Sequence, residues 1–234
     1  MRVRRVLLVG LLLLALALGA GGGYFTGDYL DAPEATASGN AAPLGEVSPS
    51  EPLLPVKTPI PSNVPALETG LNYTRHTVTL TPKGQPPEQL SIETPEGWRP
   101  TKDPSAPGEI KYLDKLRERG VRVEAVEPVT QTTADAMAQL IRNLKSSQAP
   151  ENDLRIVSQT SEQVEGDDGN PRSVSTLVYT YIPIKTRRYV IVRWVATDGG
   201  DLTTVEMSIT GLPQDAPGLD EVLKEATRSV HEIG

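Results

Sequence analysis

The sequence contains no cysteine among its 234 residues. This absence excludes disulfide bonds, catalysis by a thiol, zinc sites built on cysteine, and a lipid attached to an N-terminal cysteine. A protein that lacks these supports depends on an ordinary hydrophobic core for its stability, even in a compartment that would allow disulfides.

Residues that carry catalysis or bind metals are also scarce. The chain has two histidines, His76 and His231, and a metal site would require both to meet a carboxylate. No serine lies in a Gly-x-Ser-x-Gly motif, and the acidic stretch 167–170 lacks the ligand spacing of an EF-hand loop. We therefore expect a non-enzymatic protein with no catalytic residue, no cofactor and no metal site.

Positive charge is not in excess. Lysine and arginine number 23 against 30 acidic residues, and this net charge of −7 argues against nucleic acid as a partner. One local cluster around an expected hairpin departs from this balance, and it consists of Lys185, Arg187, Arg188 and Arg193. Such charges commonly protect a sheet edge from pairing. The alternative is a contact for a partner protein, an anionic glycan or a lipid headgroup.

The strongest positive signal is at the N-terminus. Arg2, Arg4 and Arg5 precede an apolar run, Val6–Phe25. A spanning helix needs about 20 apolar residues, and arginines hold their end of it in the cytoplasm. Because no small-x-small cleavage site follows the run at a suitable distance, we expect residues 1–31 to remain as a single-pass membrane anchor. Cleavage as a signal peptide, followed by secretion, is the alternative.

Proline marks the next segment, residues 32–70, which holds 8 of the 21 prolines among Ala, Ser, Thr and Gly. Frequent prolines bias a chain toward extended polyproline conformations, and this composition offers little apolar surface to bury. We expect a disordered, semi-rigid stalk.

Residues 71–234 have the composition of one globular domain. We expect helices over 132–147 and 216–233, with strands over 75–80, 89–93, 154–164, 172–182, 187–197 and 202–210. In the first helix Thr132 and Asp135 have the spacing of a capping box. The segment 109–126 fits either a helix or a hairpin, and the alternation after Gly120 favours the hairpin. The expected fold class is α+β, with an antiparallel sheet flanked by helices.

Apolar stripes indicate which helix faces are buried. The first stripe comprises Met137, Leu140, Ile141 and Leu144, and the second comprises Leu219, Val222, Leu223, Ala226, Val230 and Ile233. The large aromatic residues Trp98 and Trp194 are expected to pack in the core.

The order of elements resembles that of a PsbP-like domain. The residues that carry the resemblance are the strand end Thr94-Pro95-Glu96-Gly97-Trp98 and the loop at Asp103-Pro104, followed by a helix, a long meander and a last helix. Among exported proteins the chain is similar to the LpqN-type envelope proteins of actinobacteria, which also carry a proline-rich stalk. This resemblance implies an α/β/α sandwich with a non-catalytic accessory role, and it carries over no functional residues. The chain departs from the lipoprotein members because it has no cysteine to receive the lipid.

These observations predict an extracytoplasmic accessory or interaction domain of the cell envelope, which the Val6–Phe25 segment holds on the membrane. Its expected partner is an envelope protein, a glycan or a lipid. The alternative is a carrier of a lipid or another hydrophobic ligand, in a pocket between helix and sheet.

Overall fold

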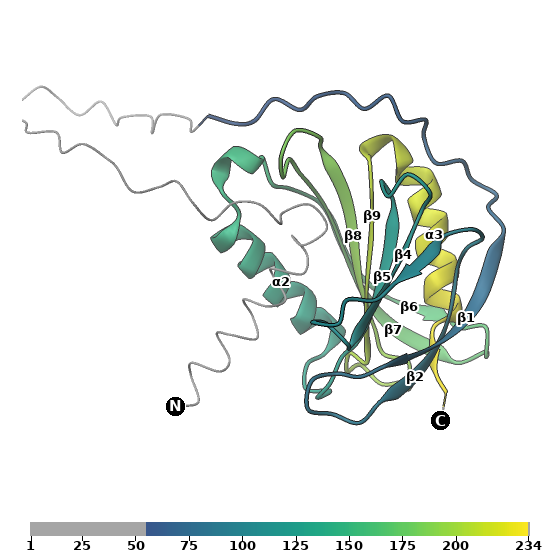
Figure 1. Ribbon diagram of the computed structural model, residues 1–234. Coiled ribbons are helices and arrows are strands. Elements are labelled where there is room, and N and C mark those ends of the chain that lie inside the picture. The colour runs from purple at the N-terminus through teal and green to yellow at the C-terminus, as the bar shows by residue number, and fades with distance from the viewer. Residues whose placement is uncertain (1–54, 234) are drawn as a thin grey trace, which may run out of the picture. The chain divides into compact units, whose positions relative to one another are not determined.

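The computed structural model describes residues 55–233 (Figure 1). The compact unit begins at Val56. The expected anchor at 1–31 and most of the expected stalk lie outside the described residues. No helix in the described part of the chain is long and apolar enough to cross a membrane.

Two antiparallel sheets form the unit, which confirms the α+β class. The larger sheet has the strand order β3 (Arg99–Thr101), β4 (Glu109–Leu113), β5 (Gly120–Ala125), β9 (Val205–Gly211), β8 (Arg188–Val195), β7 (Pro171–Tyr181) and β6 (Arg155–Glu165). The smaller sheet has the order β1 (Tyr73–Leu80), β2 (Glu88–Pro95) and β10 (His231–Glu232). Short 3-10 turns occur at Pro150–Asn152 and Pro213–Asp215.

The two α-helices among the described residues, α2 (Thr133–Ser147) and α3 (Ala216–Ser229), lie on opposite faces of the seven-stranded sheet (Figure 1). Neighbouring residues of β7 show this arrangement, because successive side chains of a strand point to opposite faces. The Ser175 hydroxyl donates a hydrogen bond to Thr133 in α2. Thr176 instead accepts one from Arg193, and the same guanidinium also reaches Thr227 in α3.

The main core lies around α3, between the two sheets. Leu219, Val222, Ala226 and Val230 have no exposed surface, and they pack among the buried side chains of β2, β8 and β9. This confirms most of the expected stripe. In α2 only Leu144 of the expected stripe is fully buried, and the others are half-buried. The N-terminus of α2 begins as expected, since the Thr132 hydroxyl oxygen accepts from the Asp135 N–H at 3.1 Å.

The segment 109–126 forms the hairpin that the alternation favoured, with β4 and β5 paired in antiparallel register. The side chain of Asp114 closes its turn by accepting from the N–H groups of Glu118 and Arg119. Arg117 adopts a left-handed conformation, with φ of 58°, within this turn.

The last helix is shorter than we expected. It ends at Ser229, and the chain continues as β10, so Ile233 is exposed and does not extend the helical stripe. The Ser229 hydroxyl donates to the Glu225 carbonyl, while the backbone of His231 and Glu232 pairs with β2. Pairing with an open strand edge therefore replaces the last helical turn that the periodicity predicted.

The stalk prediction fails for residues 56–70, which lie along the folded unit. The N–H of Lys57 donates to the Glu151 carbonyl, and the N–H of Leu67 donates to the Asp215 carboxylate at 2.8 Å. Leu67 also packs against the core. Proline removes donors only at its own positions, so the residues between prolines keep N–H groups that a neighbouring surface can satisfy.

Candidate functional site

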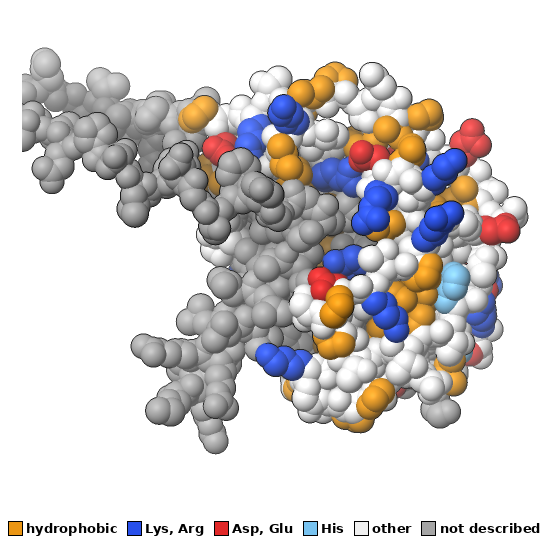
Figure 2. All heavy atoms as spheres, viewed as in Figure 1, with side chains coloured by type: hydrophobic (Ala, Val, Ile, Leu, Met, Phe, Trp, Pro, Cys, Tyr) orange, Lys and Arg blue, Asp and Glu red, His pale blue; other side chains and the backbone are white. Residues whose placement is uncertain are grey.

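The four basic residues singled out by the sequence do not form one site. Arg187 pairs with Asp153 at 2.5 Å, and Arg188 pairs with Glu118 at 2.7 Å. Figure 2 shows basic side chains dispersed over the visible face, with uncharged and apolar atoms between them. The expected contact of the whole cluster with an anion stays a prediction.

Lys185 and Arg193 lie in contrasting surroundings. Lys185 is exposed, and its backbone carbonyl accepts from the N–H of Ile60. Arg193 is buried on the α3 face of the sheet.

Arg193 lines a groove of about 420 Å³ between α3 and the edge strand β6. Its guanidinium donates to Thr176 at 2.8 Å and to Thr227 at 3.1 Å, and it lies 3.4 Å from Glu162. These bonds fix the guanidinium between strand and helix. The groove is further lined by Val164, Glu165, Asp220, Leu223, Lys224 and Arg228.

Burial acts against the charged forms of two groups in this groove, Arg193 and Asp220. Burial lowers the pKa of Arg193, although the charges of Glu162 and Asp220 act in the opposite direction. Burial raises the pKa of Asp220, and the positive charge of Arg193 opposes that shift. A groove with both signs of charge and a fixed guanidinium can bind a charged or strongly polar partner through charge-assisted hydrogen bonds. Its lining residues include no serine or histidine.

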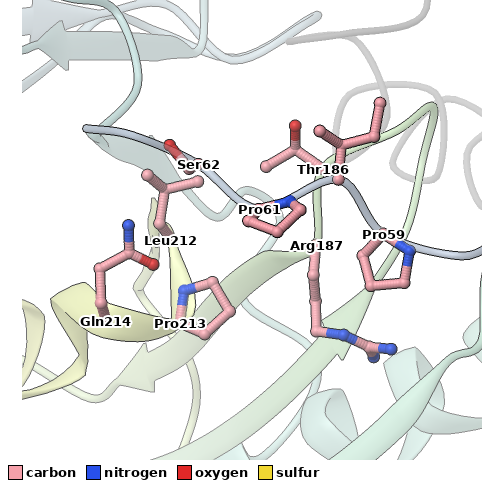
Figure 3. Close-up of a pocket in the computed structure, with 9 residues that line it drawn as sticks. Pro59, Pro61, Ser62, Thr186, Arg187, Leu212, Pro213 and Gln214 are labelled. Atoms are coloured by element: carbon pink, nitrogen blue, oxygen red, sulfur yellow. The ribbon is translucent and has the colours of Figure 1, made fainter.

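A second hollow, of about 230 Å³, lies where residues 59–62 cross the unit (Figure 3). Pro59, Pro61 and Pro213 line it together with Leu212, and Arg187 borders it. One wall belongs to the segment that the sequence assigned to the stalk, so sequence reasoning could not place this hollow.

A buried charge cluster on the other face of the sheet was also missed. The Arg122 guanidinium pairs with Glu109 at 3.1 Å and contacts the carboxylates of Glu124 and Glu206. The Trp194 indole N–H donates to Glu206 at 2.9 Å, which confirms that this tryptophan is a core residue with a satisfied polar group. The polar positions of β5 and β9 were the available signal, but polar residues that alternate with apolar ones are equally typical of a strand with one face in solvent.

The electrostatics of this cluster follow from burial. Burial raises the pKa of Glu124 to about 7, although Arg122 acts to lower it. Burial lowers the pKa of Arg122, but the charges of Glu206, Glu124 and Glu109 outweigh it and raise the pKa above its ordinary value. The cluster contains one guanidinium and three carboxylates that hold it, so we assign it a structural role.

The two histidines lie on different strands of the smaller sheet. The ring of His76 stacks on Tyr112 at 4.6 Å, and His231 Nδ1 lies 3.0 Å from the Ser229 carbonyl oxygen. Within the described residues, no group of three or more histidine or acidic side chains has the geometry to hold a metal ion.

Comparison with known proteins gives little further guidance. No family model and no curated protein matches the chain. One solved structure with partial similarity is PA94 from Pseudomonas aeruginosa, a protein of unknown function. Its sequence is 13% identical, the match covers 65% of this chain and 94% of that chain, and the TM-score is 0.38. Similarity at this level carries no argument about function.

Proposed function

We propose that the chain is a non-enzymatic accessory or interaction protein of the cell envelope. Its Val6–Phe25 segment anchors it in the membrane with the N-terminus in the cytoplasm, and the unit that begins at Val56 binds a partner outside the membrane. The apolar run that follows Arg2, Arg4 and Arg5 supports this membrane location and orientation. The groove between α3 and β6 is the observation that carries the binding role, and we propose it as the partner contact.

The shape and charge of this groove suit a polar partner better than an apolar one. Arg193 is held at the groove by two threonine hydroxyls, so it can offer its charge without reorganising. Glu162 on one side and Lys224 on the other supply charges of opposite sign. Charges arranged in this way select partners by complementarity and exclude those with mismatched charge.

We also propose a distant relationship to PsbP-like domains, within the LpqN-type envelope group. Helices on opposite faces of an antiparallel sheet support the α/β/α sandwich that this relationship implies. The missing lipidation cysteine is consistent with the proposed apolar anchor in place of a lipid.

Capture of partners from envelope extracts tests the binding role. The full chain, with a C-terminal affinity tag, should retain the same envelope component in repeated experiments. Lys224→Glu, which reverses a charge at the groove, should reduce this capture several-fold. Lys145→Glu on α2 is the matched control, because it reverses an exposed charge on the opposite face, and it should capture normally. Equal capture by both variants would remove the groove from the proposal.

The carrier of a hydrophobic ligand is the alternative function. It requires apolar space between helix and sheet, but the side chains of α3 that face the sheet are buried in close contact with it. The groove beside α3 is lined by six charged residues. Lipid that co-purifies with the full chain in defined stoichiometry, detected by native mass spectrometry, would favour the carrier over the interaction domain.

A further inference from the structure

The two edges of the seven-stranded sheet are very different. At one edge β3 has three residues and includes Pro100, and both features discourage pairing with another strand. At the other edge β6 has 11 residues, with no proline and no lysine. No described strand lies beyond β6. The outward N–H and C=O groups of such a strand form a template for a further strand.

The side chains of β6 leave this edge accessible. Nine of its 11 residues are exposed, and the exceptions are Ile156 and Val164. A bulge at Val157 bends the start of the strand, because the register with β7 shifts between Ile156 and Ser158. Residues 158–165 then pair regularly with β7. A regular run of eight residues, seven of them exposed, is long enough to receive a partner strand.

We propose that β6 pairs with β6 of a second copy of this chain, in antiparallel orientation. A two-fold axis normal to the sheet relates the two copies, so each face of one sheet continues into the same face of the other. Residues that lie directly opposite each other must then point to the same face. The axis therefore passes midway between the two copies of one residue. An axis at Ser161 uses most of the regular run, whereas an axis at Glu162 would oppose two carboxylates, which is unfavourable.

The strand is complementary to itself in this register. Gln159 lies opposite Gln163 of the second copy, and Thr160 lies opposite Glu162 of the second copy. These pairs can form hydrogen bonds, and no like charges oppose one another.

The charges near the ends of β6 support the antiparallel orientation. Asp153 forms ion pairs with both Arg155 and Arg187. One carboxylate against two guanidinium groups leaves positive charge in excess where the strand begins. At the other end Glu165 is exposed and forms no ion pair within the described residues, whereas Glu162 lies beside Arg193. Antiparallel pairing brings the basic start of each strand to the acidic end of the other, whereas a parallel pair would bring like charges together. This complementarity favours a second copy over an unrelated strand.

Single cysteines provide a direct test, because the natural chain has none. In Ser161→Cys the two thiols would lie opposite each other, with Cβ atoms about 5 Å apart. In Ser158→Cys, the matched control, the two thiols would be six residues out of register, or about 20 Å apart. After mild oxidation of the full chain, a non-reducing gel should show a covalent dimer for Ser161→Cys and only monomer for Ser158→Cys. Absence of the Ser161→Cys dimer, or equal dimer in both variants, would overturn the proposal.

A charge test examines the same register without a covalent link. Gln159→Lys with Gln163→Lys would place lysines opposite each other at two positions, and the full chain should become monomeric in light scattering. Gln159→Lys with Gln163→Glu would place opposite charges at those positions, and the dimer should persist. A wild-type chain that is monomeric at every accessible concentration would contradict the proposal, as would the same mass for both double variants.

Discussion

The guanidinium of Arg172 donates a hydrogen bond of 2.8 Å to the carbonyl oxygen of Arg228, at the C-terminal end of α3. The same nitrogen donates to the Thr227 carbonyl at 2.7 Å. Carbonyls at the end of a helix lack partners within the helix, and a positive charge there also interacts favourably with the helix dipole. Arg172 has no exposed surface, so this contact joins β7 to α3 inside the molecule.

Replacing Arg172 with methionine should therefore destabilise the fold strongly. The change removes the cap of α3 and leaves Asp168, 3.3 Å away, without its ion pair. A buried acceptor that loses its donor typically costs about 1–3 kcal/mol, and Arg172 satisfies two carbonyls at this helix end. Denaturant unfolding measures this change. Arg155→Met is the control, because its guanidinium is exposed, and its ion pair should contribute less than about 1 kcal/mol.

The buried stripe of α3 gives a second prediction. Leu223 is 6% exposed and belongs to the core cluster. Leu223→Ala should lower the free energy of unfolding by about 2–5 kcal/mol, as truncation of a buried leucine does. Lys224→Ala should stay within about 0.5 kcal/mol, because it alters an exposed neighbour. A helix that served as a mobile arm would instead show little change for either variant.

The segment 56–70 should contribute to stability, contrary to its expected role as a stalk. Asp215 is fully buried and accepts from the N–H of Leu67, the N–H of Leu212 and the guanidinium of Arg119. A fragment that begins at Leu71 loses the first of these bonds and the packing of Leu67. We expect it to lose at least about 2 kcal/mol relative to a fragment that begins at Val56, with a melting midpoint about 4–8 °C lower. Equal midpoints would restore the boundary at residue 71.

A carboxyl at the start of β2 should make stability depend on pH. Burial raises the pKa of Glu88 from 4.5 to about 7, and a hydrogen bond with Glu127 and the charges of Glu127 and Glu232 add to the shift. The folded state therefore holds this proton more tightly than the unfolded state does, so stability should fall as pH rises from about 4.5 to about 7. Glu88→Gln should flatten this dependence and increase stability above pH 7. Denaturant unfolding at pH 5 and pH 8 measures this pH dependence. If the free energy of unfolding changed with pH equally in Glu88→Gln and in the wild-type chain, the raised pKa of Glu88 would be contradicted.

Local patterns in the sequence predicted the elements whose causes are local. The spacing of Leu219, Val222 and Ala226 identified the buried face of α3, and the alternation after Gly120 identified a hairpin. The predicted end of α3, at residue 233, was wrong because β2 offers a strand edge that pairs with residues 231–232. Helical periodicity in the sequence does not reveal such an edge.

The candidate site could not be predicted in the same way. Arg188 pairs with Glu118, which lies 70 residues away in the sequence, and Arg187 pairs with Asp153, which lies 34 residues away. A cluster of arginines in sequence therefore does not imply a free basic surface. The groove at Arg193 depends on α3 lying beside β6, and only the tertiary structure places them together.

The proposed location of the folded unit can be measured with one introduced cysteine. Lys83 is exposed in the turn between β1 and β2, and the chain has no other thiol. In cells with an unbroken cytoplasmic membrane, the full chain with Lys83→Cys should react with a membrane-impermeant thiol reagent and should fractionate with membranes. Labelling that appears only after the membrane is broken would place the unit in the cytoplasm and contradict the central claim.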